Sequence, residues 1–503
     1  MIHTPMLATL LSLVFCSAGL EAAERSLVSL SAPARDLATA STAFMDAAWD
    51  ESAGLCWGPN PSQVRKRHIV RETGWYAIGL LLRNGKGDTA RVSRAITTVI
   101  NNQFDEPDRS YHGTFARSPE DPRPTGDAGM FKGYDPNWRQ FIGTVFAVIL
   151  REYEDRLPAE LIGRMEESIR KALVGEEKQG RLKASYTNIS LMHAFLLDYA
   201  GMRLKNPGFT KRGNVLAEEI YGLFKETKAF QEYNAPTYYG VDLYALALWR
   251  TRAPSPRLRE LGASMEADLW RDIARFYHAG LKNLAGPFTR AYGMDMPTYV
   301  GLTGLYFWES LGRRLAPFPM PDQPEIRMSQ DFMWGPVLAL AGTKIPADAL
   351  RDLKAFRGER QVERVITTSP RFVATAWIGK NVILGAESTS GKRGAGGQFC
   401  PVTAHWKTPA GPTGWIRLFT SPPIDAQAQK NRITMSAAGD SVFRIKAPGA
   451  KAASLGRDVW KLPGLTVRIK TDAKTFNATD RDDYIEVEYG GATKLVLETA
   501  STL

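Results

Sequence analysis

The chain has 503 residues, of which 44% are hydrophobic and 23% charged, values typical of folded globular proteins. This composition excludes a collagen, a coiled coil and a largely disordered chain, and the length predicts two or three domains. Lys and Arg number 64 against 53 acidic residues, which gives a net charge of +11 without long runs of one sign. The diffuse positive charge favours an anionic partner, either an acidic polymer or a membrane surface.

Residues 1–23 have the features of a secretion signal. They contain no Lys or Arg, and the run from Met6 to Leu20 is apolar but too short to span a membrane. Ala22 and Ala23 supply the small residues that a cleavage site needs. We therefore expect a secreted or periplasmic protein with no integral membrane segment after the signal is removed.

From residue 27 to residue 315, apolar residues recur every three or four positions, which is the period of an amphipathic helix. The sequence therefore predicts a helical domain over residues 27–315. The clearest helical stretches are Ala38 to Trp49, Thr73 to Arg83, Thr89 to Phe104, Trp138 to Asp155, Pro158 to Val174, Ser185 to Gly201, Val215 to Glu226, Thr237 to Trp249, Arg257 to Gly280 and Thr298 to Leu311.

After residue 315 the pattern changes. A Pro-rich segment and a short helical piece, Ala347 to Phe356, precede runs of β-branched and aromatic residues that are separated by turn residues. Short strands in such a succession predict an antiparallel β-sandwich domain over residues 316–503. Strands are expected at Gln361 to Thr367, Phe372 to Ile378, Asn381 to Glu387, Thr413 to Phe419, Ile433 to Ala437, Val442 to Lys446, Leu465 to Lys470, Tyr484 to Tyr489 and Thr493 to Glu498.

A long array of helices followed by an antiparallel β domain resembles the (α/α) toroid enzymes. This group includes polysaccharide lyases of the heparinase II/III, alginate lyase and chondroitin AC/hyaluronate lyase types, and several glycoside hydrolases. The resemblance covers most of the chain and rests on architecture, not on a sequence motif. It implies an N-terminal (α/α) toroid or incomplete barrel, an antiparallel β-sandwich, and a carbohydrate-active enzyme.

The first candidate site segment is a long loop that ends in Asn137 and Trp138, with His112 near its start. Long loops inside compact helical domains are uncommon and often functional, although a solvated connection is the alternative. The pair Asn137 and Trp138 is similar to a segment of the chondroitin AC and hyaluronate lyases in which an aromatic ring stacks on a sugar. That resemblance implies substrate-binding roles for His112, Asn137 and Trp138.

The second segment contains Asn188 and His193. Five steps along a helix place two side chains about 140° apart, so these two residues reach one site only if Asn188 lies in the first helical turn. In the lyases that the chain resembles, an Asn binds the uronate carboxylate and a His or Tyr removes the neighbouring proton. The resemblance gives these roles to Asn188 and His193; the alternative is a helix-start Asn and a buried structural His.

The third segment has an unusual density of polar and aromatic residues, from Glu232 and Asn234 through Tyr238 and Tyr239 to Asp242. A phenol held near the glycosidic oxygen can act as a general acid, and either Tyr238 or Tyr239 could fill this role. We assign it to Tyr239, with Tyr238 in contact with substrate. Glu232 and Asn234 are further candidates for substrate binding. Glu232 and Asp242 could equally form a carboxylate pair, and a structural aromatic turn is the alternative.

The fourth segment contains Arg290 and Tyr292, which project the same way if the backbone is extended. A guanidinium binds a carboxylate at two points and stabilises the enolate that forms when the adjacent carbon loses a proton. The alternative is that Arg290 only pairs with Asp295. In the β domain, His405 stands beside Trp406, and the heparinase-like enzymes imply that such a residue can reach the helical site.

Several kinds of site are excluded. The sequence has no Gly-rich phosphate loop, no Gly-x-Ser-x-Gly turn, no His-Glu-x-x-His and no calcium-loop spacing. We therefore predict no cofactor and no metal; calcium, or a metal whose ligands lie far apart in the chain, is the alternative. Basic residues do not gather with aromatic ones, which argues against a nucleic-acid partner. After signal removal Cys56 and Cys400 remain, either as a disulfide or as two buried thiols.

The leading hypothesis is an exported lyase for acidic polysaccharides. Asn188 and Arg290 would neutralise the uronate carboxylate, His193 or a Tyr would remove the proton, and Tyr239 would protonate the leaving oxygen. A second hypothesis is a glycoside hydrolase on the same scaffold that uses two carboxylates; its candidates are Glu232, Asp242, Asp135 and Asp295. A third is a noncatalytic glycan-binding protein of the cell envelope.

Overall fold

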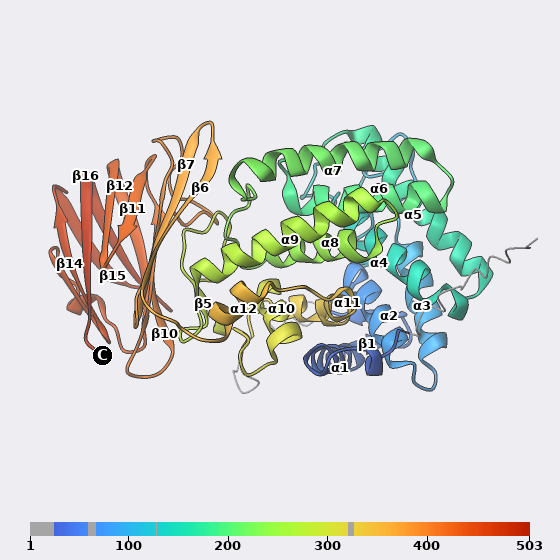
Figure 1. Cartoon of the computed structure of the whole chain (residues 1–503), viewed down its shortest axis with the longest axis horizontal. Helices are drawn as coiled ribbons and strands as arrows, with labels where there is room; N and C mark the ends of the chain where they lie inside the picture. Colours follow the sequence, from blue (N-terminus) through green and yellow to red (C-terminus); the bar gives the residue numbers. More distant parts are fainter. Residues whose placement is uncertain (1–24, 59–66, 127, 320–325) are drawn as a thin grey trace, which may run out of the picture.

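The structure, a computed structural model, describes residues 25–58, 67–126, 128–319 and 326–503. A helical domain and a β domain lie side by side along the long axis of the molecule (Figure 1). The predicted secretion signal, residues 1–23, lies outside the described residues. Across those described ranges, we find no helix with the length and apolar character that a membrane crossing requires.

The helices form a double ring. They are α1 (Ala32–Asp46), α2 (Val70–Arg83), α3 (Asp88–Asn101), α4 (Trp138–Tyr153), α5 (Ala159–Gln179), α6 (Thr187–Arg203), α7 (Pro207–Thr227), α8 (Tyr238–Arg252), α9 (Pro256–Phe276) and α10 (Leu302–Leu311). The inner helices α2, α4, α6, α8 and α10 each contact the next, and α1 closes the ring between α10 and α2. The outer helices α3, α5, α7 and α9 each pack on the inner helix that precedes them. The predicted (α/α) toroid is confirmed.

Burial explains which helices lie inside. The inner helix α6 is buried along nearly its whole length, so its sequence is apolar on all sides. The outer helix α7 buries one stripe, formed by Gly213, Ala217, Ile220 and Phe224, and exposes the rest. An outer helix therefore keeps the amphipathic period that an inner helix loses.

The helical domain extends beyond the predicted boundary at residue 316. Every residue of α11 (Gly335–Ala341) is buried, and this helix contacts α1, α2, α8 and α10. The next helix, α12 (Ala347–Lys354), packs on α9. The β domain therefore begins near Arg360, and the boundary is corrected. The short apolar run of α11 carries no helical period because other helices surround it.

The β domain is one antiparallel sheet folded around its own core. Its strands are β6 (Arg360–Thr368), β7 (Arg371–Ile378), β8 (Val382–Ser388), β9 (Val402–Lys407), β10 (Thr413–Thr420), β11 (Asp425–Gln429), β12 (Arg432–Lys446), β13 (Val459–Leu462), β14 (Leu465–Thr471), β15 (Thr475–Asp480) and β16 (Ile485–Ser501). The strand order is β13-β14-β16-β12-β10-β9-β8-β7-β6, with β15 beside β16. The first half of β12 pairs with β11, its second half pairs with β10, and β11 also meets β8. These pairings fold the sheet over one hydrophobic core, which confirms the predicted antiparallel sandwich.

Five short strands lie within the described part of the helical domain. They are β1 (Trp49–Asp50), β2 (Leu55–Trp57), β3 (His68–Ile69), β4 (Tyr277–His278) and β5 (Asn283–Leu284). Strands β1 to β3 form one small sheet, and β4 pairs with β5.

The loop between β5 and α10 joins the two domains. The Phe288 amide donates to the Cys400 carbonyl at 3.0 Å, the Cys400 amide donates back at 2.9 Å, and the Ala291 amide donates to the Gln398 carbonyl at 2.9 Å. At Gly385 an added Cβ would lie 2.0 Å from the Gly286 carbonyl oxygen, so this close approach of two backbones requires glycine. The β domain therefore fixes the position of the loop that carries Arg290 and Tyr292.

Cys56 and Cys400 are buried free thiols. Burial raises the pKa of the Cys400 thiol to about 11.

Candidate active site

Glu232 lies at the centre of a group of charged and aromatic side chains at the start of α6 and α8. Its carboxylate accepts hydrogen bonds from the Asn188 amide, from the Thr187 hydroxyl at 3.3 Å and from Nη1 of Arg290 at 2.6 Å. Thr187 and Asn188 form the first turn of α6, where unpaired N–H groups and the helix dipole favour negative charge. We call Asn188, Glu232, Tyr238, Arg290 and Tyr292 the Glu232 cluster.

Arg290 is held in place and still reaches solvent. Its Nε donates to the side-chain oxygen of Gln398 at 2.9 Å, and its guanidinium carbon lies 3.9 Å from the centre of the Tyr238 ring. The side chain keeps 31% of its surface exposed. The guanidinium is therefore oriented before any ligand arrives, and it is accessible to an anionic group.

Tyr238 and Tyr292 share a hydrogen bond, with their hydroxyl oxygens 2.5 Å apart. Tyr238 begins α8, and Tyr292 lies in the loop before α10. Burial raises the pKa of Tyr238 well above its ordinary range, although the positive charge of Arg290 opposes that shift. Tyr238 therefore stays protonated at neutral pH, and a proton donor stands beside a second phenol.

Asn137 and Tyr186 extend the group toward α4. The Asn137 amide nitrogen donates to the Tyr186 hydroxyl at 3.0 Å. Burial raises the pKa of Tyr186. The negative charge of Glu232 raises this pKa further and the positive charge of Arg290 lowers it, so the three groups interact electrostatically. Next to Asn137, the ring of Trp138 lies 5.3 Å from the guanidinium of Arg71.

Two buried amide oxygens near the Glu232 cluster lack a hydrogen-bond donor. They are Oδ1 of Asn137 and Oδ1 of Asn188, neither of which has a partner among the described residues. Buried acceptors of this kind are rare because each costs free energy unless water or a ligand donates to it. The two oxygens therefore mark positions where a hydroxyl-bearing ligand would gain hydrogen bonds.

The structure does not bring His193 and Tyr239 to the Glu232 cluster. His193 is buried, and its ring nitrogens lie 3.4 Å from the Gln140 amide and 3.2 Å from the Glu177 carboxylate. The buried Tyr239 hydroxyl has no hydrogen-bond partner in the described part of the chain. Burial raises the pKa of Tyr239 well above its ordinary range, and the negative charge of Asp272 raises it further. Neighbouring helix residues point about 100° apart, so Tyr238 faces the cluster and Tyr239 faces away.

Three predicted substrate-binding residues are held in structural contacts elsewhere. The His112 ring is buried, and its Nδ1 lies 3.7 Å from Asp105. Asn234 donates to the carbonyl oxygens of Ala285 at 2.7 Å and Pro287 at 2.9 Å. The third is His405.

His405 is fully buried between the domains. Its Nε2 lies 2.7 Å from the Met294 carbonyl oxygen, and burial lowers its pKa to about 4. The ring is therefore neutral and supports the loop that carries Tyr292. It acts on the Glu232 cluster only through that loop.

Among the four carboxylates proposed for a hydrolase, Glu232 and Asp242 interact with each other. Burial raises the pKa of Asp242 well above its ordinary range, and the negative charge of Glu232 raises it further. The Asp135 carboxylate instead accepts a hydrogen bond from the backbone amide of Asn137 at 3.0 Å. Asp295 accepts one from Asn283 at 2.8 Å, and burial raises its pKa to about 6. Within the described ranges, no three His, Cys, Asp or Glu side chains form a group that could hold a metal ion.

Asp242→Asn is expected to gain stability relative to the wild type as pH rises. The folded-state pKa of Asp242 is raised, so the unfolded chain loses this proton first. The contribution of neutral Asp242 is therefore complete at acidic pH and is lost as pH rises toward the folded-state pKa. Asparagine cannot ionise and avoids this loss. Denaturant unfolding at several pH values between acidic and neutral will measure the difference.

Asp348→Asn is the control for this prediction. Asp348 is exposed, and its hydrogen bond with Arg271 lowers its pKa. As pH rises, Asp348→Asn should therefore lose stability relative to the wild type, and this loss should be small. If the difference in unfolding free energy between Asp242→Asn and the wild type did not change with pH, Asp242 would not be buried in its neutral form.

Two residues of the site escaped prediction from the sequence. Tyr186 stands directly before α6, and Gln398 lies in the turn of the β domain that pairs with the Arg290 loop. Tyr186 stands two residues before the predicted site residue Asn188, and Gln398 stands seven residues before His405. Their roles depend on contacts with residues far away in the chain, which no local pattern reveals.

Comparison with known proteins identifies two adjacent families. Residues 35–343 match the family described as Domain of unknown function (DUF8769), and residues 359–499 match Domain of unknown function (DUF8770). No curated protein matches the chain in sequence.

Solved structures of carbohydrate-active proteins are distantly similar in fold. Heparinase III is 11% identical with a TM-score of 0.40, over 95% of this chain and 86% of that one. A mutant chondroitin AC lyase of Streptomyces coelicolor A3 is 11% identical with a TM-score of 0.39, over 93% and 80%. A mutant of Rex8A from Paenibacillus barcinonensis, complexed with an arabinofuranosyl-xylotetraose, is 11% identical with a TM-score of 0.34, over 64% and 93%.

Proposed function

The chain belongs to the family described as Domain of unknown function (DUF8769), and we propose that it is a carbohydrate-active enzyme that cleaves an acidic, uronate-containing polysaccharide by β-elimination. One observation carries this proposal: Arg290, Asn188 and Thr187 surround a single carboxylate beside a hydrogen-bonded tyrosine pair. The carboxylate in that position belongs to Glu232. A uronate carries the same chemical group, so the donors that hold Glu232 suit the substrate as well.

The reaction follows from these positions. Arg290 and Asn188 bind the uronate carboxylate, which takes the place of Glu232, and they stabilise the negative charge that develops on it. Tyr292 acts as the base that removes the proton from the carbon next to the carboxylate. Tyr238, which burial keeps protonated, donates its proton to the leaving glycosidic oxygen. One C–H and one C–O bond break, and a carbon–carbon double bond forms.

The net charge of the chain supports an acidic polymer as substrate. The chain carries a net charge of +11, which attracts polyanions. We further propose that residues 1–23 direct the protein out of the cytoplasm, to the periplasm or the medium, where such polysaccharides occur.

Ultraviolet absorbance tests the proposed reaction. Elimination creates an unsaturated uronate whose conjugated double bond absorbs, so purified protein should raise the absorbance of at least one of hyaluronate, chondroitin, heparan sulfate, alginate and polygalacturonate. A matching rise in reducing ends is expected. New reducing ends without absorbance would reject elimination, and no change in either signal would favour the noncatalytic binding protein.

A glycoside hydrolase is the second candidate function. It is favoured by the interaction of Asp242, a buried neutral acid, with the Glu232 carboxylate, because hydrolases use one protonated and one ionised carboxyl group. Asp242 is completely buried, which places it out of direct reach of a substrate in this conformation. A hydrolase predicts that Asp242→Asn abolishes the release of reducing ends, whereas a lyase predicts that this variant stays active.

A further inference from the structure

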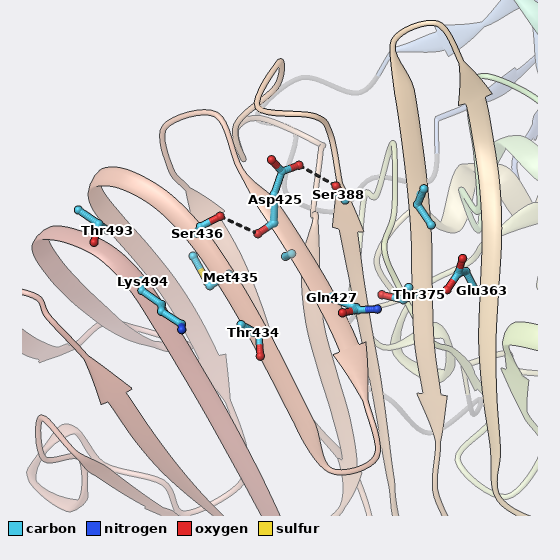
Figure 2. A pocket seen from close by; sticks show the side chains of 12 residues that line it. Glu363, Thr375, Ser388, Asp425, Gln427, Thr434, Met435, Ser436, Thr493 and Lys494 are labelled. Atoms are coloured by element: carbon cyan, nitrogen blue, oxygen red, sulfur yellow. Dashed lines mark hydrogen bonds between the residues drawn. The ribbon is translucent and has the colours of Figure 1, made fainter.

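A cavity of about 750 Å³ lies in the β domain, between the β6–β7 hairpin and the face of β11, β12 and β16 that points away from the core (Figure 2). Its volume is within the range of pockets that bind small ligands, about 300–1,000 Å³. None of the residues that line it belongs to the Glu232 cluster. We call it the β-domain groove.

The strand register aligns polar side chains along this groove. On each strand the polar residues alternate with core residues: Gln427 lies between the buried Ala426 and Ala428, and Thr434 lies between Ile433 and Met435. Directly paired positions are Asp425 with Ser436, Ser436 with Lys494, Gln427 with Thr434, and Glu363 with Thr375. Such pairs place Cβ atoms about 4.5–5.5 Å apart. The groove therefore presents closely spaced donors and acceptors (Figure 2).

Several of these groups are available to a ligand. The Glu363 carboxylate, the Thr434 hydroxyl and the Lys494 ammonium have no hydrogen-bond or ion-pair partner among the described residues of the chain. The Gln427 amide oxygen accepts one long bond, at 3.4 Å from Gln429, and its amide nitrogen donates to none of them. Asp425, in contrast, already accepts a bond from the Ser388 hydroxyl at 2.7 Å.

Charge and backbone pairing narrow the class of ligand. Two carboxylates and one ammonium give the groove no excess of positive charge, in a chain whose total is +11, so a polyanion would find little attraction there. The strands β7, β12 and β16 are hydrogen-bonded to neighbours on both sides. On the outer edge of β11, the Ala428 amide donates to the Thr375 hydroxyl and the Ala428 carbonyl accepts from the Gln361 side chain, each at 2.8 Å, so an added peptide strand would have to displace these bonds. The class of ligand that these features favour is a neutral molecule that can both donate and accept hydrogen bonds.

We propose that the β-domain groove binds a neutral, hydroxyl-rich segment of a glycan, as a second carbohydrate site separate from the Glu232 cluster. Sugar hydroxyls donate to the Glu363 carboxylate and the Gln427 oxygen, and they accept from the Gln427 nitrogen and from Lys494. The partly exposed, apolar side chain of Val373 provides contact for the C–H face of a ring. This binding does not require the elimination reaction.

Binding of the full chain to neutral polysaccharides tests the proposal. Xylan, galactomannan and a mixed-linkage β-glucan serve as probes in affinity gel electrophoresis. Calorimetry then uses oligosaccharides of the polysaccharide that slows the migration of the protein. The wild type should bind at least one of them. Gln427→Ala should weaken binding about tenfold through the loss of paired hydrogen bonds, and Thr434→Arg should abolish it by filling the groove.

Asn477→Ala is the matched control, because Asn477 is an exposed amide side chain on β15 that neither lines the cavity nor contacts Gln427. It should bind like the wild type, and so should Arg290→Ala, which keeps this test separate from the proposed elimination. Failure to bind any of the three polysaccharides would overturn the proposal. So would binding that survives both groove variants, or binding that Arg290→Ala removes.

Discussion

Arg290→Ala is expected to lower kcat/KM for an acidic polysaccharide by about 100- to 1,000-fold, the usual effect of removing one group that stabilises developing negative charge. Arg290 is the positively charged group beside the carboxylate position, and its contacts with Gln398 and Tyr238 orient it in advance. Arg290→Lys keeps the charge but loses the two-point geometry, so an intermediate loss is expected. Initial rates from the absorbance of the unsaturated product will measure both variants.

Arg257→Ala is the control for this result. Arg257 also bonds a carboxylate, that of Glu218 at 2.6 Å, and lies over a tyrosine ring, that of Tyr221 at 5.8 Å. It belongs to the outer helix α9, and its partners Glu218, Glu260 and Tyr221 are not part of the Glu232 cluster. The Arg257 variant should keep wild-type activity. An Arg290→Ala enzyme with normal kcat/KM would remove the basis of the proposed carboxylate site.

Tyr238→Phe is expected to reduce kcat by about 100- to 10,000-fold, the range that general acid catalysis contributes. The ring contact with Arg290 remains in this variant, so KM should change little. Tyr292→Phe removes the other half of the hydrogen-bonded pair and should cause a loss of similar size. Steady-state kinetics on the polysaccharide that the wild type cleaves will separate kcat from KM.

Tyr239→Phe distinguishes this assignment from the one favoured by the sequence. The buried Tyr239 hydroxyl has no hydrogen-bond partner in the described part of the chain, so its removal should leave kcat unchanged. Unfolding curves of all three variants show whether any loss of activity is a loss of folding. If Tyr239→Phe were inactive and Tyr238→Phe active, the roles assigned to the two residues would be reversed.

Much of the fold follows from local patterns. The stretch predicted as a helix from Trp138 forms α4, and the expected strand from Phe372 lies within β7. These elements have a clear period because each buries one face or one stripe. Helix α11 escaped prediction for the opposite reason, since it is surrounded by other helices and carries no alternation of polar and apolar residues.

The sequence by itself determined which segments carry unusual chemistry. Asn188, Glu232, Tyr238, Arg290 and Tyr292 all come from segments in which polar and aromatic residues are dense, and amino-acid composition is a local property that needs no contacts to be read. The order of a helical domain before a β domain was fixed in the same way, by periodicity along the chain.

Only the tertiary structure decided which of these residues meet. Glu232 and Arg290 come from separate loops, and the β domain positions the loop of Arg290 through backbone hydrogen bonds. The direction in which a helical side chain points, and the partners that then enclose it, depend on how the whole ring packs. For this reason Tyr238 joined the cluster, while its neighbour Tyr239 and the buried His193 did not.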